Sequence, residues 1–172
     1  MIILVMGVSG SGKTTIGKLL ADSLHWTFSD ADTFHSPENV EKMRRGIPLT
    51  EADRTPWLQD LQTAIKHWLQ ENQNMVLACS ALKDSYRQFL LVDSDGCANA
   101  KGERIKIVYL KGSYQLIQNR LQERQNHYMS ATLLESQFNT LEEPLDTIYI
   151  DIAESPQVIV QNIKTALGMG NW

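Results

Sequence analysis

The chain has 172 residues, of which 42% are hydrophobic, and its formal net charge is −4. These values fit one globular domain and argue against a disordered chain or a protein that binds nucleic acid through a basic surface. Two cysteines, Cys79 and Cys97, provide neither a disulfide framework nor a metal site. The apolar run Ile2–Met6 is too short to cross a membrane, and the N-terminus lacks a secretory signal pattern. We therefore expect a cytoplasmic protein that binds neither nucleic acid nor a membrane.

Short apolar runs alternate with helical patterns along the chain. The apolar runs predict strands over residues 2–6, 26–30, 75–79, 105–110 and 147–151. Apolar residues at helical spacing predict helices over residues 14–24, 57–69, 113–124 and 130–141, and Ser155-Pro156 is typical of the start of a last helix. Strands that alternate with helices in this way predict an α/β fold with a mostly parallel sheet covered on both faces.

Two polar segments interrupt the alternation within what we interpret as a single domain over residues 1–172. They cover about residues 30–57 and 124–144. Insertions into a compact α/β domain commonly form lids and substrate clamps. We therefore predict an acceptor-binding segment in the first and a lid in the second.

The segment Gly7–Thr14, GVSGSGKT, matches the phosphate-loop pattern G-x-x-x-x-G-K-[ST] between a predicted strand and a predicted helix. Its glycines let successive backbone N–H groups point at one anion, and the following helix adds its positive dipole end. Lys13 is suited to the terminal phosphates of a nucleotide, and the Thr14 hydroxyl is suited to Mg²⁺. The predicted nucleotide-binding residues are Gly7, Val8, Ser9, Gly10, Ser11, Gly12, Lys13, Thr14 and Thr15.

Other motifs narrow the class of phosphate-loop protein. A GTPase would carry an Asn-Lys-x-Asp motif, which the sequence lacks. A motor or AAA-type ATPase would have an apolar strand that ends in Asp next to the first strand, whereas residues 75–80 end in Cys-Ser. Asp151 does end an apolar run, but that run is the last of the chain and predicts an edge strand, so we interpret Asp151 as structural. Small size and two polar insertions favour a kinase that clamps a small acceptor.

Two carboxylates follow the second predicted strand. Asp30 and Asp32 would lie at the carboxyl end of the sheet, where α/β proteins bind ligands. In phosphoryl transfer one carboxylate can hold Mg²⁺ through water and another can orient or deprotonate the attacking hydroxyl. We assign the metal role to Thr14 and Asp30 and the catalytic role to Asp32, together with Lys13.

Cationic and polar side chains follow this acid pair. His35, Lys42 and Arg54 are predicted to bind the acceptor, since a polyhydroxylated acid requires cations that pair with its carboxylate. The alternative interpretation is local, with Ser36-Pro37 starting a helix and Asp53 capping another.

Several segments together resemble the gluconate kinase (gluconokinase) family. In chain order they read GVSGSGKT, DADTFH, NVEKM..G.PLTEADRTPWL, CSALK..YR, IVYLKG, RL..R..H and SQFNTLEEP, from about residue 3 to about residue 151. The resemblance implies a P-loop NTPase fold like that of nucleoside monophosphate kinases, with a five-stranded parallel sheet, helices on both faces and a lid. It implies transfer of the γ-phosphate of ATP, with Mg²⁺, to the 6-hydroxyl of D-gluconate, which would feed the pentose phosphate pathway. Members are often homodimers.

The resemblance also implies roles for single residues. Ser80 and Lys83, in CSALK, would reach the acceptor or the phosphates at the end of the third strand. Arg120 and Arg124 are four residues apart and would share one helix face, from which they could stabilise charge on the transferred group. The alternative is a solvated helix face. His127 is a further candidate for substrate contact, or a plain loop residue.

Two other functions stay open on the sequence. One is a different small-molecule kinase of the shikimate-kinase type, since such kinases also carry an Asp-x-Asp after the second strand. The other is a nucleotide-binding switch without turnover.

Overall fold

A computed structural model of the protein describes residues 1–91, 104–123, 131–145 and 147–170. Parallel strands form a five-stranded sheet in the order β2-β3-β1-β4-β5. The strands are β1 (Ile2–Met6), β2 (Thr27–Asp30), β3 (Met75–Ala78), β4 (Ile105–Lys111) and β5 (Ile148–Asp151). Because β1 is central and pairs with β3 and β4, the loop that follows it opens at the middle of the sheet.

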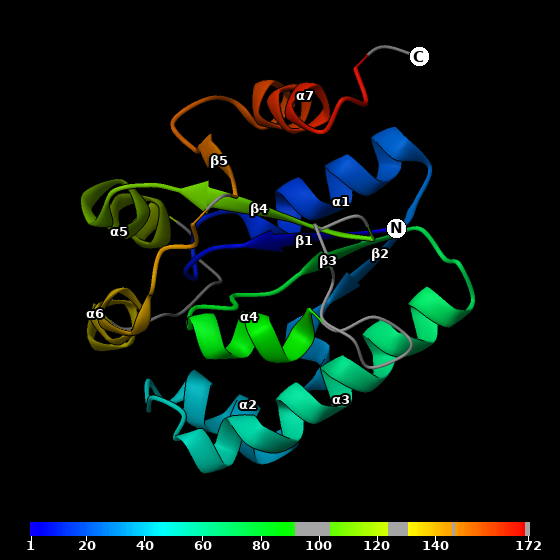
Figure 1. The fold of residues 1–172 in the computed structure, drawn as a ribbon. Coiled ribbons are helices and arrows are strands. Elements are labelled where there is room, and N and C mark those ends of the chain that lie inside the picture. The colour runs from blue at the N-terminus through cyan, green and yellow to red at the C-terminus, as the bar shows by residue number, and fades with distance from the viewer. Residues whose placement is uncertain (92–103, 124–130, 146, 171–172) are drawn as a thin grey trace.

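Helices cover both faces of this sheet (Figure 1). α1 (Lys13–Leu24) and α7 (Pro156–Ala166) lie on one face, and α3 (Glu51–Gln70) and α4 (Asp84–Leu90) lie on the other. The remaining elements are η1 (Ala31–Phe34), α2 (Pro37–Arg44), α5 (Tyr114–Glu123) and α6 (Ala131–Thr140). Within the described parts of the chain, no helix has the length and apolar character needed to span a bilayer.

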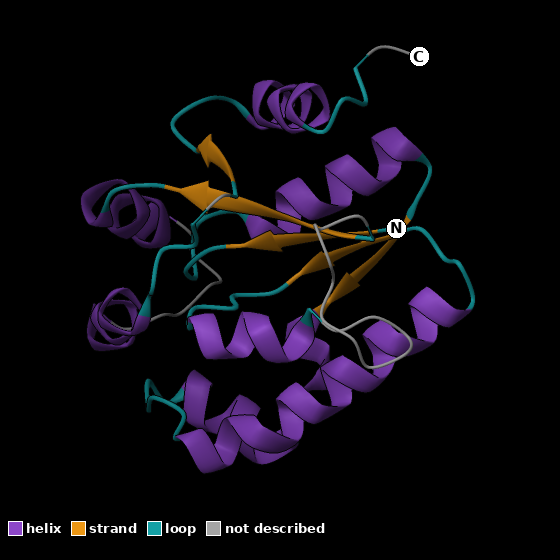
Figure 2. Ribbon diagram, viewed as in Figure 1, coloured by secondary structure: helices purple, strands orange, loops and turns teal. Residues whose placement is uncertain are grey.

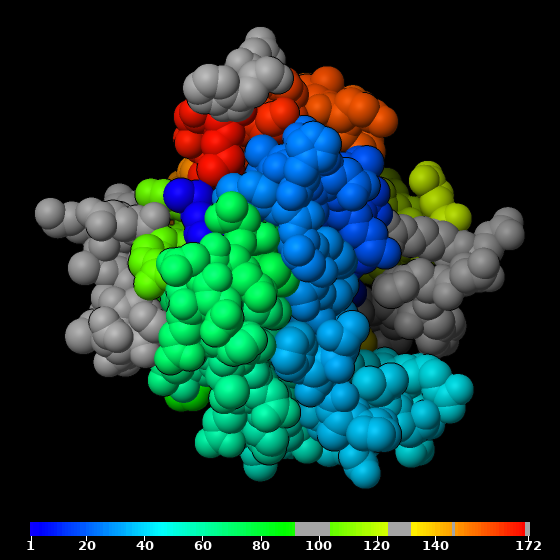
Figure 3. All heavy atoms as spheres, turned by 90° about the vertical axis from the view of Figure 1, so that its right-hand side faces the viewer, coloured from blue at the N-terminus to red at the C-terminus, as the bar shows by residue number. Residues whose placement is uncertain are grey.

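The side chains of β1 divide between two apolar layers. Ile3 and Val5 pack with the α1 and α7 side of the core, whereas Ile2 and Leu4 pack with the α3 side. This alternation follows from the period of two along a strand, and burial on both faces requires the continuous apolar run that the sequence has. At the end of the molecule seen in Figure 3, α1 (blue), α3 (green) and α7 (orange to red) form one closed surface.

The predicted strands are confirmed, with boundaries that differ by one residue at most. The predicted helices 14–24, 113–124 and 130–141 are confirmed in the same way as α1, α5 and α6, and the last helix begins at Pro156 with Ser155 as its N-cap. The short helix α4 was not predicted from the sequence, and α2 was predicted only in the alternative interpretation of residues 36–37. Cys79 is buried, as expected of a core residue, and Cys97 lies outside the described residues.

The predicted start of the α3 helix is wrong. α3 begins at Glu51 rather than at Trp57, and Thr50, not Asp53, is its N-cap. The Thr50 hydroxyl accepts a hydrogen bond from the Asp53 amide, while the Asp53 carboxylate accepts one from the Thr50 amide. This capping box stabilises a polar first turn that has no apolar periodicity. Pro56, which lacks a backbone N–H, lies inside the helix.

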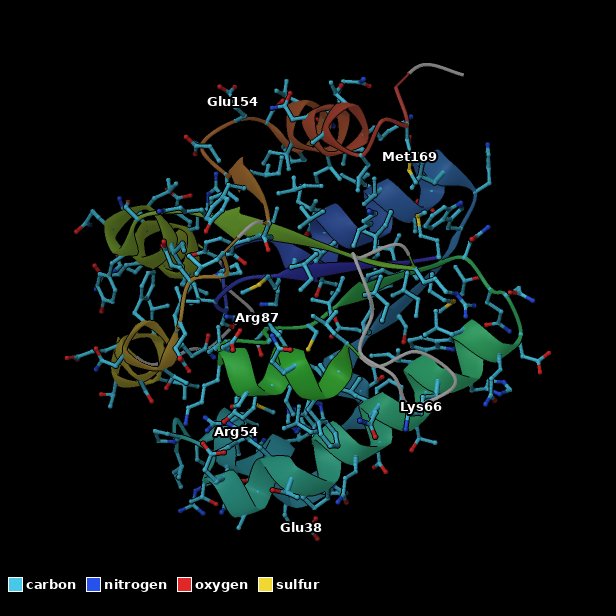
Figure 4. All side chains as sticks on the ribbon, viewed as in Figure 1. Glu38, Arg54, Lys66, Arg87, Glu154 and Met169 are labelled. Atoms are coloured by element: carbon cyan, nitrogen blue, oxygen red, sulfur yellow. The ribbon has the colours of Figure 1, made fainter. Side chains whose placement is uncertain are left out.

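Arg87 joins two loops at the carboxyl end of the sheet. Its side chain is buried in α4 and donates hydrogen bonds to the carbonyl groups of Ala81, Leu82 and Glu142. The Glu142 amide in turn donates to the Leu82 carbonyl at 2.8 Å. The loop after β3 and the chain that leaves α6 are therefore fixed to each other, and both border the site described below. Figure 4 shows Arg87 and Arg54 at this end of the molecule and Lys66 at the other end of α3.

We expect Arg87→Ala to destabilise the fold, because it removes the donor of the Ala81 and Glu142 carbonyl groups and one of the two donors of the Leu82 carbonyl. The loss should be about 3 kcal/mol, or a Tm lower by roughly 6–12 °C. Arg87→Lys should lose less, since one ammonium can satisfy some of these carbonyl groups. Thermal unfolding measures both, with exposed Gln88→Ala as the control in the same helix. Equal Tm values for all three variants would contradict the role of Arg87.

Candidate active site

The loops that follow β1, β2 and β3 meet at the carboxyl end of the sheet (Figure 2). They carry the phosphate loop, the Asp30–Asp32 pair and the CSALK segment. Because parallel strands end on the same side, residues far apart in the sequence converge here. The structure thus brings the predicted nucleotide-binding residues together with the predicted catalytic carboxylate.

The phosphate loop has the backbone conformation that its glycines allow. Gly10 and Gly12 have φ angles of +82° and +94°, a region that disfavours side chains. A Cβ atom on Gly10 would also lie 2.8 Å from Leu121 of α5. Gly12 is the N-cap of α1 and provides no side-chain cap, so the first-turn N–H groups are left for an anion.

Two polar groups indicate that this loop is built for an anion. The Ser11 hydroxyl is buried and has no hydrogen-bond partner within the described residues. The Lys13 ammonium contacts the Val8 carbonyl at 3.1 Å, and burial lowers the pKa of Lys13, although the charges of Asp32 and Asp30 oppose this shift. A partly buried cation beside an unpaired donor fits the phosphates of a nucleotide.

Thr14 and Asp30 are in contact, as a shared metal role requires. The Thr14 hydroxyl donates to Asp30 Oδ2 at 2.7 Å, and Asp30 Oδ1 accepts the Asp32 amide at 2.9 Å. In the described parts of the chain, no group of three or more His, Cys, Asp or Glu side chains could hold a metal alone. The pair therefore suits Mg²⁺, which keeps several waters and binds jointly to phosphate and one or two protein oxygens.

A cavity of about 100 Å³ lies beside the phosphate loop. It is lined by Ser9, Lys13, Asp32, His35, Met43, Pro48, Leu49, Arg54, Trp57, Ser80, Leu82, Tyr86, Leu133, Ser136, Gln137 and Thr140. A more open groove of about 870 Å³ shares Ser9, Asp32, Met43 and Leu133 with it. Asp32 therefore faces both spaces, next to the loop that would hold the phosphates.

One wall of the cavity is a fixed aromatic stack. The rings of His35 and Trp57 lie 4.5 Å apart and are tilted by only 11°, and the Trp57 indole donates to the Ala31 carbonyl. Burial lowers the pKa of His35, with Asp32 opposing and Arg54 adding to the shift. The imidazole is therefore neutral at pH 7. It can donate a hydrogen bond to a hydroxyl group or accept one from it.

Arg54 and Lys83 converge on Glu51. Glu51 Oε1 accepts hydrogen bonds from Lys83 Nζ at 2.7 Å and from the Tyr86 hydroxyl at 2.8 Å, and Arg54 Nη1 lies 3.5 Å away. Arg54 also donates to the Tyr86 hydroxyl at 3.1 Å. The hydrogen bond with Lys83 is the main reason that the pKa of Glu51 is lowered. Donors thus surround one carboxylate at the margin of the cavity, an arrangement that could also receive the carboxylate of a ligand.

The other predicted site residues differ in their surroundings. Lys42 donates to Asp53 at 2.8 Å and lowers the pKa of Asp53 to about 2, and it does not line the cavity. Arg120 donates to the Ile152 carbonyl. Arg124, His127 and the first part of the predicted lid lie outside the described residues. The roles of these residues stay predictions.

Several residues that line the cavity had no site role predicted from the sequence. Trp57 and Tyr86 occur in the quoted segments PLTEADRTPWL and CSALK..YR, but both were read only as parts of a motif. Ser136, Gln137 and Thr140 of α6 form another wall. Their presence in SQFNTLEEP was the available signal, and helical spacing of polar residues 136, 137 and 140 places them on one face.

Comparison with known proteins defines the class. The chain matches the family model described as shikimate kinase over residues 9–167. The crystal structure of shikimate kinase from Aquifex aeolicus vf5 superposes with a TM-score of 0.58 at 20% identity, over 98% of this chain and 96% of that one. The matched family model and the phosphate loop place this chain among the P-loop kinases, and the similarity to the Aquifex aeolicus structure concerns the fold alone.

More similar proteins define the family. The Mus musculus protein named "Probable gluconokinase" is 47% identical over 83% of each chain, and the gluconokinase of Arabidopsis thaliana is 41% identical over 94% of this chain and 89% of that one. The crystal structure of a gluconokinase from Sinorhizobium meliloti 1021 has a TM-score of 0.81 at 39% identity, over 96% of this chain and 90% of that one. The chain belongs to the gluconokinase family.

The stability of the protein should depend on His35 as the pH falls. Because burial places the pKa of folded His35 below its ordinary value of 6.5, the neutral ring contributes stability that is complete above pH 6.5 and is lost as the pH falls below it. We therefore expect the difference in Tm between the protein and His35→Gln to shrink from pH 7.5 to pH 5. A difference that stays constant or grows toward pH 5 would contradict the neutral stacked ring.

Proposed function

We propose that this kinase transfers the γ-phosphate of ATP to the 6-hydroxyl of D-gluconate, giving 6-phospho-D-gluconate and ADP. The observation that carries the proposal is the shared cavity: Lys13 of the phosphate loop, Asp32 and Arg54 line one space. Donor phosphate, acceptor hydroxyl and acceptor carboxylate can then be held at fixed relative positions. Such positioning provides most of the catalysis in phosphoryl transfer.

Asp32 is the group best placed to act on the acceptor hydroxyl. The Asp30 carboxylate holds the Asp32 amide, and the indole of Trp57 holds the neighbouring Ala31 carbonyl at 2.8 Å. These contacts fix the turn that carries Asp32, so its carboxylate can orient the hydroxyl and take its proton. The hydroxyl oxygen then bonds to the γ-phosphorus while the bond to the leaving oxygen of ADP breaks.

Lys13, Thr14 and Asp30 would serve the nucleotide. Lys13 would neutralise charge on the terminal phosphates, and the Thr14–Asp30 pair would hold Mg²⁺. When bound, the ion neutralises charge on the phosphate oxygens and aligns them. The buried Ser11 hydroxyl and the first-turn amides of α1 supply further donors.

Acceptor recognition would depend on the opposite side of the cavity. Arg54 and Tyr86 line this side and are suited to the carboxylate of gluconate. Lys83 could join them, because it donates to the same Glu51 oxygen as Tyr86 and therefore lies near both. His35, Ser80 and Asp32 offer partners for the hydroxyl groups of the sugar acid. A cytoplasmic location and a homodimer belong to the same proposal.

The acceptor is testable with the purified protein. In a coupled assay of ADP formation with MgATP, we expect turnover with D-gluconate and little with shikimate, AMP or glucose. A signal with shikimate or AMP and none with gluconate would contradict the proposed acceptor. ATP binding without any acceptor-dependent ADP release would instead support the nucleotide switch.

Substitutions should separate chemistry from recognition. Asp32→Asn should lower kcat by about 10²-fold or more with little change in the KM for ATP. Arg54→Ala should raise the KM for gluconate by about tenfold or more and leave the KM for ATP nearly unchanged, because a charged partner of the carboxylate is lost.

The control is Arg45→Ala, which removes an exposed arginine from the end of α2. It should leave both constants near the values of the unaltered protein. An unchanged kcat in Asp32→Asn would remove Asp32 from the chemistry. An effect of Arg54→Ala on ATP alone would place Arg54 at the nucleotide.

A further inference from the structure

A side chain of α6 accepts a hydrogen bond from one of the backbone amides of the phosphate loop. The Ser9 N–H donates a hydrogen bond to Gln137 Oε1, with 2.6 Å between nitrogen and oxygen. The two residues are 128 positions apart in the chain, and both line the cavity that contains Lys13 and Asp32. The bond therefore crosses from the nucleotide side of the site to the acceptor side.

The helix that carries Gln137 is fixed by its packing. Leu133 and Leu134 are buried, and the rings of Phe138 and Tyr114 meet edge to face at 5.3 Å. The chain that leaves α6 is held by the bond between the Glu142 amide and the Leu82 carbonyl. With α6 packed in this way, a change of partner at position 137 requires only rotation of the Gln137 side chain.

The Ser9 amide can serve only one strong acceptor. A terminal phosphate in the phosphate loop would be an anionic acceptor, and a charge-assisted hydrogen bond is about twice as strong as a bond to a neutral carboxamide. Ser9 lies at the start of the loop and lines the cavity with Asp32, whereas Lys13 and Thr14 start the helix. The phosphate that reaches Ser9 is therefore the one nearest the acceptor.

We propose that Gln137 links the two substrates by exchanging partners, an inference that rests on the proposed kinase function. In the protein without nucleotide the carboxamide oxygen holds the Ser9 amide. When the terminal phosphate of ATP takes that amide, the carboxamide turns within the cavity it already lines and binds the acceptor hydroxyl groups with its oxygen and NH₂ group. ADP, which lacks the terminal phosphate, leaves the Ser9–Gln137 bond intact.

The test measures dissociation constants for Mg²⁺ complexes of ADP and of a non-hydrolysable ATP analogue by titration calorimetry. Gln137→Ala removes the competing oxygen, so it should bind the ATP analogue about two- to tenfold more tightly and leave ADP unchanged. Gln137→Glu places a carboxylate beside the terminal phosphate, so it should bind the analogue about tenfold or more weakly, with a smaller effect on ADP. The two variants should thus change the affinity for the ATP analogue in opposite directions.

The second part of the test measures the affinity for gluconate. In the presence of the ATP analogue, Gln137→Ala should bind gluconate about two- to tenfold more weakly than the unaltered protein, and without nucleotide the two should bind it equally. The matched control is Asn139→Ala, an exposed polar residue of the same helix, which should change none of these constants. Thermal unfolding verifies that each variant is folded.

The inference is overturned if Gln137→Ala changes the dissociation constants of the ATP analogue and of ADP by the same factor, or changes neither. It is overturned as well if both variants change the dissociation constant of the ATP analogue in the same direction. It is also overturned if gluconate affinity is the same in Gln137→Ala and the unaltered protein with the analogue bound. Failure of the proposed function looks different: the unaltered protein would not bind gluconate at all, while the nucleotide arm would still report on the exchange at Ser9.

Discussion

The ammonium group of Lys13 is the charge on which the rest of the site depends. It is partly buried, and the resulting loss of solvation lowers its pKa. Asp32 and Asp30 oppose the shift, but the Asp30 carboxylate already accepts hydrogen bonds from the Thr14 hydroxyl and the Asp32 amide. A buried cation is stable only when an anion or several acceptors surround it. A bound anion would complete the surroundings of Lys13. Three features are suited to bind it: the backbone turn of residues 7–12, the start of α1 without a side-chain cap, and the buried Ser11 hydroxyl.

Rigid elements, rather than loops alone, hold the acceptor side in position. α3 carries Arg54 and Trp57, α4 carries Tyr86, and α6 carries Gln137. The Arg87 guanidinium of α4 holds the loop after β3 and the chain that leaves α6 together at the carboxyl end of the sheet. Side chains mounted in this way lose little freedom when a ligand binds, which favours precise orientation of the acceptor hydroxyl.

The sequence predicted the sheet and the phosphate loop well because both have strong local signals. A strand buried on both faces requires a continuous apolar run, and the phosphate loop requires glycines at fixed spacing. The start of α3 was missed because its first turn is polar and Pro56 lies inside the helix, although Thr50-Glu-Ala-Asp53 fits the capping-box pattern. α4 is too short for its apolar periodicity to be recognised, and Glu51 and Gln137 gain their roles from partners distant in the chain. The single-residue roles at Lys42, Arg120 and Arg124 stay predictions.

A crystal structure of the protein with magnesium, a non-hydrolysable ATP analogue and D-gluconate tests the central claim most directly. The account predicts that the phosphate chain lies within hydrogen-bond distance of the amides of residues 9–13 and of Lys13 Nζ. It further predicts that the 6-hydroxyl of gluconate lies between the terminal phosphate and the Asp32 carboxylate, with the gluconate carboxylate on Arg54. Gluconate bound away from Asp32, or phosphates bound outside the loop after β1, would contradict it.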